Sequence, residues 1–176
     1  MKISIIGGTG GMGEGFALRW VVNHDITIGS RDAEKAKTSA EQYMNTALSS
    51  YGNNLKGTIK GADYVSSATD SDILILSIPY ESIKLTCDSI SNNIGNDCII
   101  VSPIVPMERN DAGFTYIPFE KSMKSAAHLL AENLPGKKVV SAFHTIAEVK
   151  LKNINESLDS DTSSGDLCGC PKSHNR

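Results

Sequence analysis

Short apolar runs recur along this chain, separated by longer stretches in which polar and apolar residues mix. These runs lie at residues 3–6, 26–28, 73–78, 98–101 and 139–143, and a further short strand is expected at 58–59. Continuous apolar runs rich in β-branched residues are typical of strands that are buried on both faces of a parallel sheet. The pattern therefore predicts a central sheet whose strands are distributed over most of the chain.

The stretches between these runs have helical character. In FALRWVV, the apolar residues Phe16, Leu18, Trp20 and Val21 give a helix one face for the sheet. Further helices are expected at residues 33–48, 82–94 and 122–134, one helical turn within 61–72, and irregular structure at 113–120. Strands that alternate with helices predict an α/β fold with a doubly wound, mainly parallel sheet, which is the Rossmann NAD(P)-binding fold.

The chain changes character near residue 155. Residues 1–154 carry the strand and helix patterns and are expected to form one domain of this fold. Residues 155–176 are rich in Ser, Asp and Gly, contain few apolar residues and show no periodicity, so we expect a polar, disordered tail.

A glycine-rich turn follows the first apolar run. Gly8, Gly10 and Gly13 have the spacing G-x-G-x-x-G, in which the glycines allow a tight turn, a close approach of a pyrophosphate and close packing of the next helix. Gly11 and Met12 would open that helix, whose free N–H groups and dipole favour an anion. A purely structural turn is the alternative, but the strand before and the helix after favour a dinucleotide site.

The end of the second strand carries a cation where NAD-binding proteins need an acid. Ser30 and Arg31 stand at this place, and a hydroxyl beside a guanidinium suits the 2′-phosphate of NADP. Asp32 is a candidate N-cap of the next helix, and Lys35 would add charge near the same phosphate. The alternative is that Arg31 is a solvated loop residue.

Later strand ends supply further candidates. Pro79 ends one strand, so Ser82 with its neighbours Tyr80 and Glu81 is expected beside the cofactor. In SPIVP, two prolines stiffen a loop that would present Ile104 and Val105 as an apolar wall, although this loop can also be ordinary strand termination. His144 follows the last strand on the expected ligand side, with a structural histidine as the alternative.

Composition and charge narrow the class of protein. The 176 residues are 40% hydrophobic and 21% charged, with a net charge of −3. The chain has no excess of basic residues that would indicate nucleic-acid binding. No signal peptide or membrane anchor is recognised, so the expected location is the cytoplasm. Cys87 and Cys98 lie in apolar patterns and are expected to be inert core thiols. Cys168 and Cys170, with His174 nearby, lack paired ligand spacing, so no metal is expected.

Several separated motifs resemble the archaeal and bacterial oxidoreductases that transfer a hydride between NADP(H) and the deazaflavin coenzyme F420. The matching segments are GGTGGMGEGFALRW, IGSRDAEKA, LSIPYE, VSPIVP, GFTY and VVSAFHTI, in this order. The resemblance implies NADP(H) and coenzyme F420 as cofactor and co-substrate, and a homodimer. It implies NADP contacts at Thr9, Gly10, Gly11, Met12, Ser30, Arg31, Lys35, Ile78, Ser82 and Val105, and a ring-stacking wall of Ala142, His144 and Ile146.

The resemblance covers residues 1 to about 158. Family members continue through V-C-G-D-D into a strand and helices that complete the deazaflavin site and the dimer, whereas residues 165–169 only echo that stretch. We therefore expect this chain to bind NADP(H) but to bind the deazaflavin weakly, and to be monomeric or prone to aggregation. An NADPH-dependent flavin or ferric reductase and a noncatalytic NADP-binding sensor are the alternative functions.

Overall fold

A parallel six-stranded sheet forms the centre of the computed structural model, which describes residues 1–111, 113–119, 125–156 and 158. The strand order is β3-β2-β1-β4-β5-β8, and every neighbouring pair is parallel. The strands are β1 (Lys2–Ile6), β2 (Asp25–Ser30), β3 (Ile59–Asp63), β4 (Ile73–Leu76), β5 (Ile99–Ser102) and β8 (Lys138–Ser141). The doubly wound α/β fold is confirmed.

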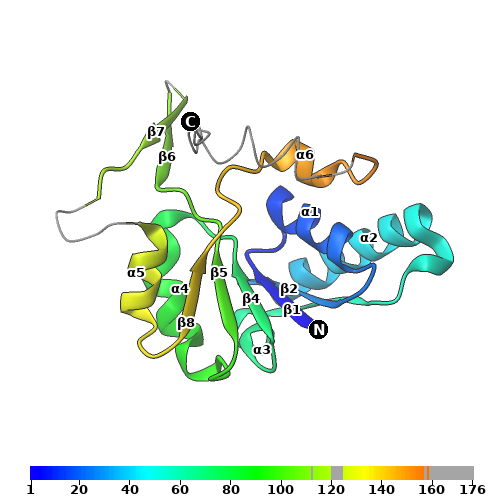
Figure 1. Cartoon of the computed structure of the whole chain (residues 1–176), viewed down its shortest axis with the longest axis horizontal. Coiled ribbons are helices and arrows are strands. Elements are labelled where there is room, and N and C mark those ends of the chain that lie inside the picture. The colour runs from blue at the N-terminus through cyan, green and yellow to red at the C-terminus, as the bar shows by residue number, and fades with distance from the viewer. Residues whose placement is uncertain (112, 120–124, 157, 159–176) are drawn as a thin grey trace, which may run out of the picture.

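Helices cover both faces of the sheet (Figure 1). One face carries α1 (Gly11–Trp20), α2 (Ala33–Tyr51) and α6 (Glu148–Lys152), and the other carries α3 (Tyr64–Ala68), α4 (Ile83–Ile90) and α5 (Ala126–Asn133). Short 3₁₀ turns occupy Gly52–Asn54, Tyr80–Ser82 and Ser91–Asn93. None of the helices in the described residues is long and apolar enough to cross a membrane.

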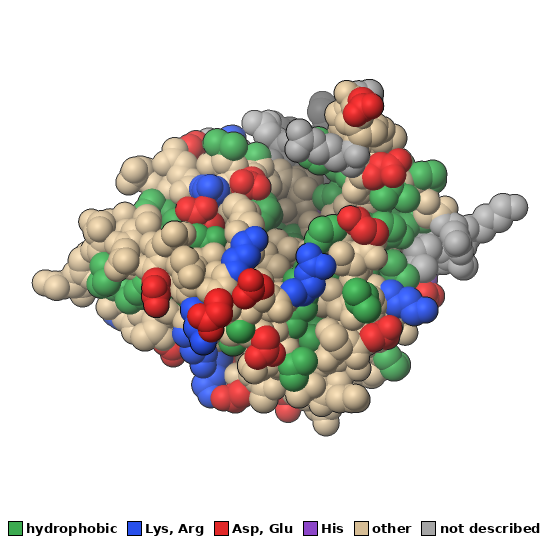
Figure 2. Space-filling model, turned by 180° about the vertical axis from the view of Figure 1, so that it is seen from behind, with side chains coloured by type: hydrophobic (Ala, Val, Ile, Leu, Met, Phe, Trp, Pro, Cys, Tyr) green, Lys and Arg blue, Asp and Glu red, His purple; other side chains and the backbone are tan. Residues whose placement is uncertain are grey.

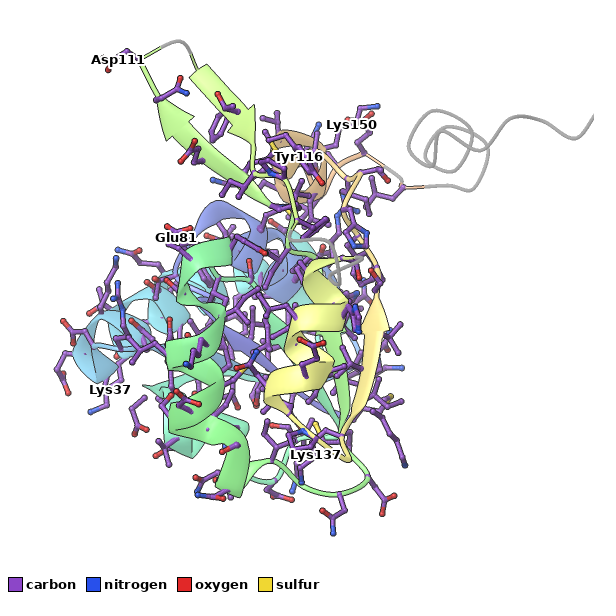
Figure 3. All side chains as sticks on the ribbon, turned by 90° about the vertical axis from the view of Figure 1, so that its left-hand side faces the viewer. Lys37, Glu81, Asp111, Tyr116, Lys137 and Lys150 are labelled. Carbon is purple, nitrogen blue, oxygen red and sulfur yellow. The ribbon has the colours of Figure 1, made fainter. Side chains whose placement is uncertain are left out.

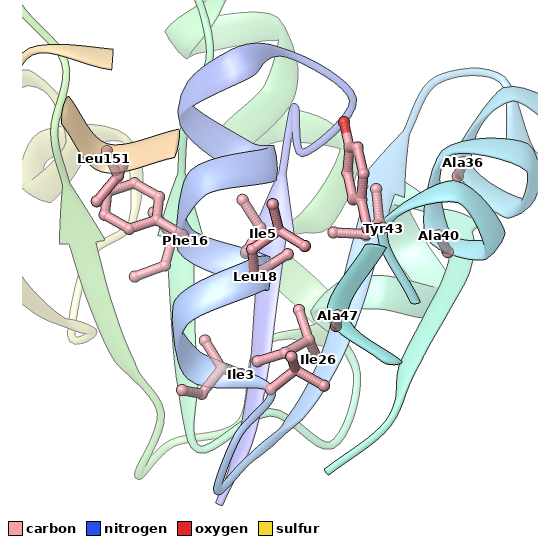
Figure 4. Packing of buried hydrophobic residues seen from close by; sticks show 14 of the residues in the cluster. Ile3, Ile5, Phe16, Leu18, Ile26, Ala36, Ala40, Tyr43, Ala47 and Leu151 are labelled. Carbon is pink, nitrogen blue, oxygen red and sulfur yellow. The ribbon is translucent and has the colours of Figure 1, made fainter. Parts of the chain in front are cut away.

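Alternate strand residues supply the two cores. Ile5 of β1 and Ile75 of β4 point to the layer of α1 and α2, while Ile6 and Leu76 point to the layer of α3, α4 and α5. Figure 4 shows the first layer, where α1 and α2 pack side by side over the central strands. Because side chains alternate along a strand, only strands with apolar residues at successive positions can bury both faces.

The chain reverses its direction of travel across the sheet between β1 and β4. From β1 the chain moves outward through β2 to β3, and it then returns to β4 on the other side of β1 and continues to β5 and β8. In open α/β sheets, ligands bind outside the carboxyl ends of the strands at such a reversal. A ligand site is therefore expected at the loops after β1 and β4.

Several element boundaries differ from the sequence predictions. Residues 113–120 were expected to be irregular, but β6 (Met107–Asn110) and β7 (Gly113–Tyr116) pair as an antiparallel hairpin. This is a correction: the mixed polar and aromatic sequence hides two strands that are stabilised by each other rather than by core burial. Helix α5 begins at Ala126 because the Ser125 side chain accepts the His128 N–H at 3.0 Å, and residues 122–124 lie outside the described part.

The strand predicted at 58–59 reaches Asp63 along β2, and those predicted at 73–78 and 139–143 end earlier, at Leu76 and Ser141. Of the predicted tail, Leu158 packs against the core around α1, while residues 157 and 159–176, with Cys168, Cys170 and His174, lie outside the described residues. The expectations about the tail stay predictions. Cys87 and Cys98 are buried and free, and burial raises the pKa of each thiol to about 11.

Charged side chains of both signs are interspersed on the face shown in Figure 2. No extended area of one sign stands out there. This distribution agrees with the small net charge of the chain. On this face, a charged ligand would therefore be bound by individual charged residues.

Candidate cofactor-binding site

The glycine-rich turn lies directly after β1, at the point where the sheet topology reverses. Gly7 adopts φ 76°, and its N–H donates to Gly29 O at 3.0 Å. The tight turn therefore depends on Gly7, one residue earlier than Gly8, to which the sequence reasoning assigned it. Gly8 is buried below the turn, and its N–H donates to Ile5 O and Gly29 O.

Helix α1 starts from this turn at close range. A Cβ at Gly13 would overlap the backbone of Gly8, so the third glycine of the motif does permit close packing, as predicted. Glu14 N–H donates to Gly10 O at 2.9 Å, and the amides of Gly11 and Met12 precede this bond, so they have no partner within the helix. These amides and the helix dipole together favour an anion above the turn.

The end of β2 places a cation beside the turn. Arg31 is exposed immediately after the strand, and the buried Ser30 accepts the Asp32 N–H on its Oγ at 3.2 Å. Asp32 caps α2 as predicted, since its carboxylate accepts the N–H groups of Glu34 and Lys35 at 2.9 and 3.2 Å. The Lys35 side chain is exposed in the first turn of α2 and lines neither of the cavities described below.

One cavity, of about 320 Å³, lies between the ends of β2 and β3 and the start of α4. The predicted residues Arg31, Ile78 and Ser82 line it. Its remaining wall is largely apolar and includes Tyr64 and Leu85. Burial raises the pKa of the Tyr64 phenol, with a smaller opposing effect from the charge of Arg31. The lining thus combines the cation of Arg31 and the carboxyl group of Asp63 with apolar side chains.

A second cavity, of about 930 Å³, opens on the other side of the turn. The glycine turn, the loop after β4 and the SPIVP loop line it through the predicted residues Gly10, Gly11, Met12, Ile78 and Val105. The two cavities share Ile78 and Pro79, so they form one continuous rim around the carboxyl ends of β1 and β4.

The β6–β7 hairpin supplies an apolar wall to the second cavity, through Met107 and Phe114. Figure 3 shows the hairpin extending beyond the sheet, with Asp111 toward its far end and Glu81 on the main body below it. Below the hairpin, Phe119 makes edge contacts with Tyr80 and Tyr116, at centroid distances of 6.1 and 6.0 Å. These aromatic contacts connect the hairpin to the loop after β4.

The residues after β8 are placed differently from the other candidates. His144 is exposed, and its Nε2 lies 2.9 Å from Ser141 Oγ, while Ala142 and Ile146 pack against the core around α1. None of these three residues lines either cavity, whereas the next residues, Ala147 and Glu148, line the second one. A ring-stacking role for Ala142, His144 and Ile146 stays a prediction.

Sequence reasoning missed several lining residues. Tyr64 follows β3 directly, and a correct end for that strand would have placed it at the ligand side of the sheet. Met107 and Phe114 belong to the hairpin that was taken as irregular. No local sequence signal marks Glu148, because its position depends on how α6 packs on α1.

The sheet reversal, the glycine turn and the two connected cavities define a dinucleotide-binding domain of the Rossmann class. Residues 2–106, more than half of the chain, match the family described as NADP oxidoreductase, coenzyme F420-dependent. The chain belongs to this family.

Named relatives agree with this assignment. The chain is 32% identical over 164 residues to the F420-dependent NADP reductase of Methanothermobacter thermautotrophicus, covering 92% of this chain and 68% of the relative. It is 33% identical over 161 residues to the enzyme of the same name from Methanocaldococcus jannaschii, covering 92% and 70%.

A solved structure supports the fold. The crystal structure of a putative F420-dependent NADP-reductase from an Arthrobacter species superimposes with a TM-score of 0.67 at 20% sequence identity. The match covers 85% of this chain and 64% of that one, so the chain spans less than two thirds of that protein's length.

Proposed function

We propose that this chain transfers a hydride between NADP(H) and the deazaflavin coenzyme F420. The observation that carries the proposal is the pair of cavities joined at Ile78 and Pro79, with Arg31 in one and the glycine turn beside the other. Family membership and the names of the relatives support the same reaction.

The residues present suit the parts of NADP(H). The adenine would occupy the cavity of Tyr64 and Leu85. The 2′-phosphate on the adenosine ribose would lie near Ser30 and Arg31. The pyrophosphate would lie over the amides of Gly11 and Met12. A Cβ at Gly11 would intrude into the space that the pyrophosphate needs. This path uses most of the predicted contacts and extends from one cavity to the other across the shared rim.

The second cavity has the character that ring-to-ring hydride transfer requires. When bound, NADPH supplies two electrons and a proton as a hydride from C4 of its nicotinamide to C5 of the deazaflavin, which also takes a proton from solvent. Ile104, Val105, Met107 and Phe114 provide an apolar lining that would exclude water and hold flat rings. No acid or base from the protein is needed in this proposal.

The test is a spectrophotometric assay that follows the deazaflavin absorbance after addition of NADPH. We expect absorbance loss with NADPH and far slower loss with NADH. Reduction of free flavin or ferric iron in place of the deazaflavin would favour the alternative reductases. Tight NADP(H) binding without hydride transfer to any acceptor would favour the sensor.

We further propose small molecules as the partners of this site and the cytoplasm as its location. The net charge of −3 and the mixture of both signs on the face shown in Figure 2 favour a small molecule over nucleic acid. The expected monomeric or aggregating state, in place of the homodimer that the family implies, stays a prediction, and light scattering of the purified chain would test it.

A further inference from the structure

One acidic side chain lies over the start of α1. Glu148 is the first residue of α6 and lines the second cavity together with Gly10, Gly11 and Met12. A Cβ added at Gly11 would overlap the Glu148 carboxyl group, so this carboxyl group rests directly against the first residue of α1. In the proposed function, the pyrophosphate would lie in the same space.

The backbone of α6 is held firmly at this place. The Arg19 guanidinium donates to the carbonyl oxygens of Leu151, Asn153, Lys150 and Glu156 at 2.7, 2.8, 3.0 and 3.1 Å. Leu151 is buried against α1, and a Cβ on Gly15 would overlap it. Since α6 is fixed on α1 in this way, Glu148 cannot leave the turn by a free movement of its segment.

The charge of Glu148 is not neutralised by a close partner in the part of the chain that the structure describes. Lys152, one turn further along α6, pairs with Glu14 at 2.8 Å. The pairing with Glu14 raises the pKa of Lys152. The charge of Glu148 raises the same pKa by a smaller amount. The carboxyl group of Glu148 therefore lies against the first residue of α1 without an ion-pair partner among the described residues.

We propose that Glu148 sets the affinity of the site by occupying the pyrophosphate position of the ligand-free protein, and that its side chain must rotate away when NADP(H) binds. The inference rests on the proposed function, since it deepens the use of the same site. Like charges repel at close range, so a carboxylate against the first residue of α1 would compete with a pyrophosphate for the same helix N-terminus. The exposed position of Glu148 leaves room for this rotation.

The experiment compares wild type with Glu148→Gln and Glu148→Ala in calorimetric titrations with NADP⁺ and, separately, with inorganic pyrophosphate. Both variants should bind NADP⁺ about three- to thirtyfold more tightly, because a competing charge is removed. The matched control is Glu41→Gln, an exposed residue of α2 outside both cavities, which should leave the affinity unchanged. In the ligand-free protein, Glu148→Gln should also shift the amide resonances of Gly11 and Met12.

Equal NADP⁺ affinity of wild type and both Glu148 variants would overturn the inference while leaving the proposed function intact. If wild type fails to bind NADP⁺, the proposed function fails, and the pyrophosphate titration and the amide shifts still decide the role of Glu148. Tighter pyrophosphate binding by the variants, together with shifted amide resonances of Gly11 and Met12, would then support the role of Glu148. Unchanged pyrophosphate affinity and unchanged amide resonances would refute this role.

Discussion

At the scale of single residues, Arg31 is expected to determine the choice between NADP(H) and NAD(H). It follows β2 at the place where an acid would bind the ribose of NAD, and it lines the proposed adenosine cavity. A charge-assisted contact to a phosphate is worth about 1.5–3 kcal/mol, so Arg31→Ala should weaken NADP(H) binding by roughly 10- to 150-fold. Binding of NAD(H), which lacks the phosphate, should hardly change.

Fluorescence titrations with both cofactors measure this difference. Lys37→Ala is a suitable control, since Lys37 is an exposed cation of α2 that pairs with Glu34 rather than facing the cavity. Equal losses of affinity for NADP(H) and NAD(H) in Arg31→Ala would show that the arginine does not recognise the 2′-phosphate.

The buried thiols give a residue-scale prediction about pH. Cys87 and Cys98 have pKa values of about 11 in the fold because burial disfavours the thiolate, against 9.0 when unfolded. The unfolded chain therefore releases protons that the native chain retains, and stability falls as pH rises from 9 to 11. Each thiol contributes a slope of up to about 1.4 kcal/mol per pH unit.

Urea unfolding at several pH values can separate this effect from other alkaline titrations. The free energy of unfolding of Cys98→Ala should fall less steeply between pH 9 and 11 than that of wild type, whatever its absolute value. Parallel slopes would mean that the thiol is not protected from ionisation by burial.

At the scale of elements, the close packing of α1 on the glycine turn should be visible in stability. A methyl group at Gly13 would overlap the Gly8 backbone, which cannot move without disturbing β1. We expect Gly13→Ala to lower the free energy of unfolding by roughly 1–3 kcal/mol and to weaken NADP(H) binding as α1 shifts. Gly95→Ala is the control, because a Cβ there meets open space, and it should change stability by less than about 0.5 kcal/mol.

The attachment of α6 depends on Arg19, which donates to four carbonyl oxygens at and beyond the end of that short helix. Removing a charged donor from such bonds typically costs about 1.5–3 kcal/mol. Arg19→Ala should therefore accelerate amide hydrogen exchange in residues 151–154 more than in the sheet. Unchanged protection of this segment would contradict the role of Arg19. Arg31→Ala is the matched control, because Arg31 follows β2 and makes none of these bonds to α6.

Helices and strands could be predicted from the sequence where their buried residues leave an apolar pattern. The runs around Ile5, Ile28 and Ile75 had to be central strands, because each supplies apolar residues to one core or to both. The β6–β7 hairpin was not predictable in this way, since Phe114 and Tyr116 remain exposed and leave no burial pattern. Helix α6 was missed for a related reason: only Leu151 is buried, and the helix is too short to show a period.

At the scale of the whole molecule, the glycine turn, Arg31 and the apolar wall of Ile104 and Val105 could be placed at the cavities from the sequence, and the remaining lining residues could not. Gly13 and Arg31 were found because the glycine motif and the arginine each follow a strand that the apolar pattern predicts. Tyr64, Met107 and Glu148 line the cavities only because distant segments meet at the carboxyl edge of the sheet. The order of the strands in the sheet brings these segments together, and no local sequence pattern specifies that order.

The central claim is that the two cavities joined at Ile78 and Pro79 form one NADP site. A crystal structure of the chain with NADP⁺ tests it most directly. The account predicts adenine beside Tyr64 and Leu85, the 2′-phosphate at Arg31, the pyrophosphate over Gly11 with Glu148 turned aside, and nicotinamide in the second cavity. A dinucleotide bound elsewhere, or one whose 2′-phosphate makes no contact with Arg31, would contradict it.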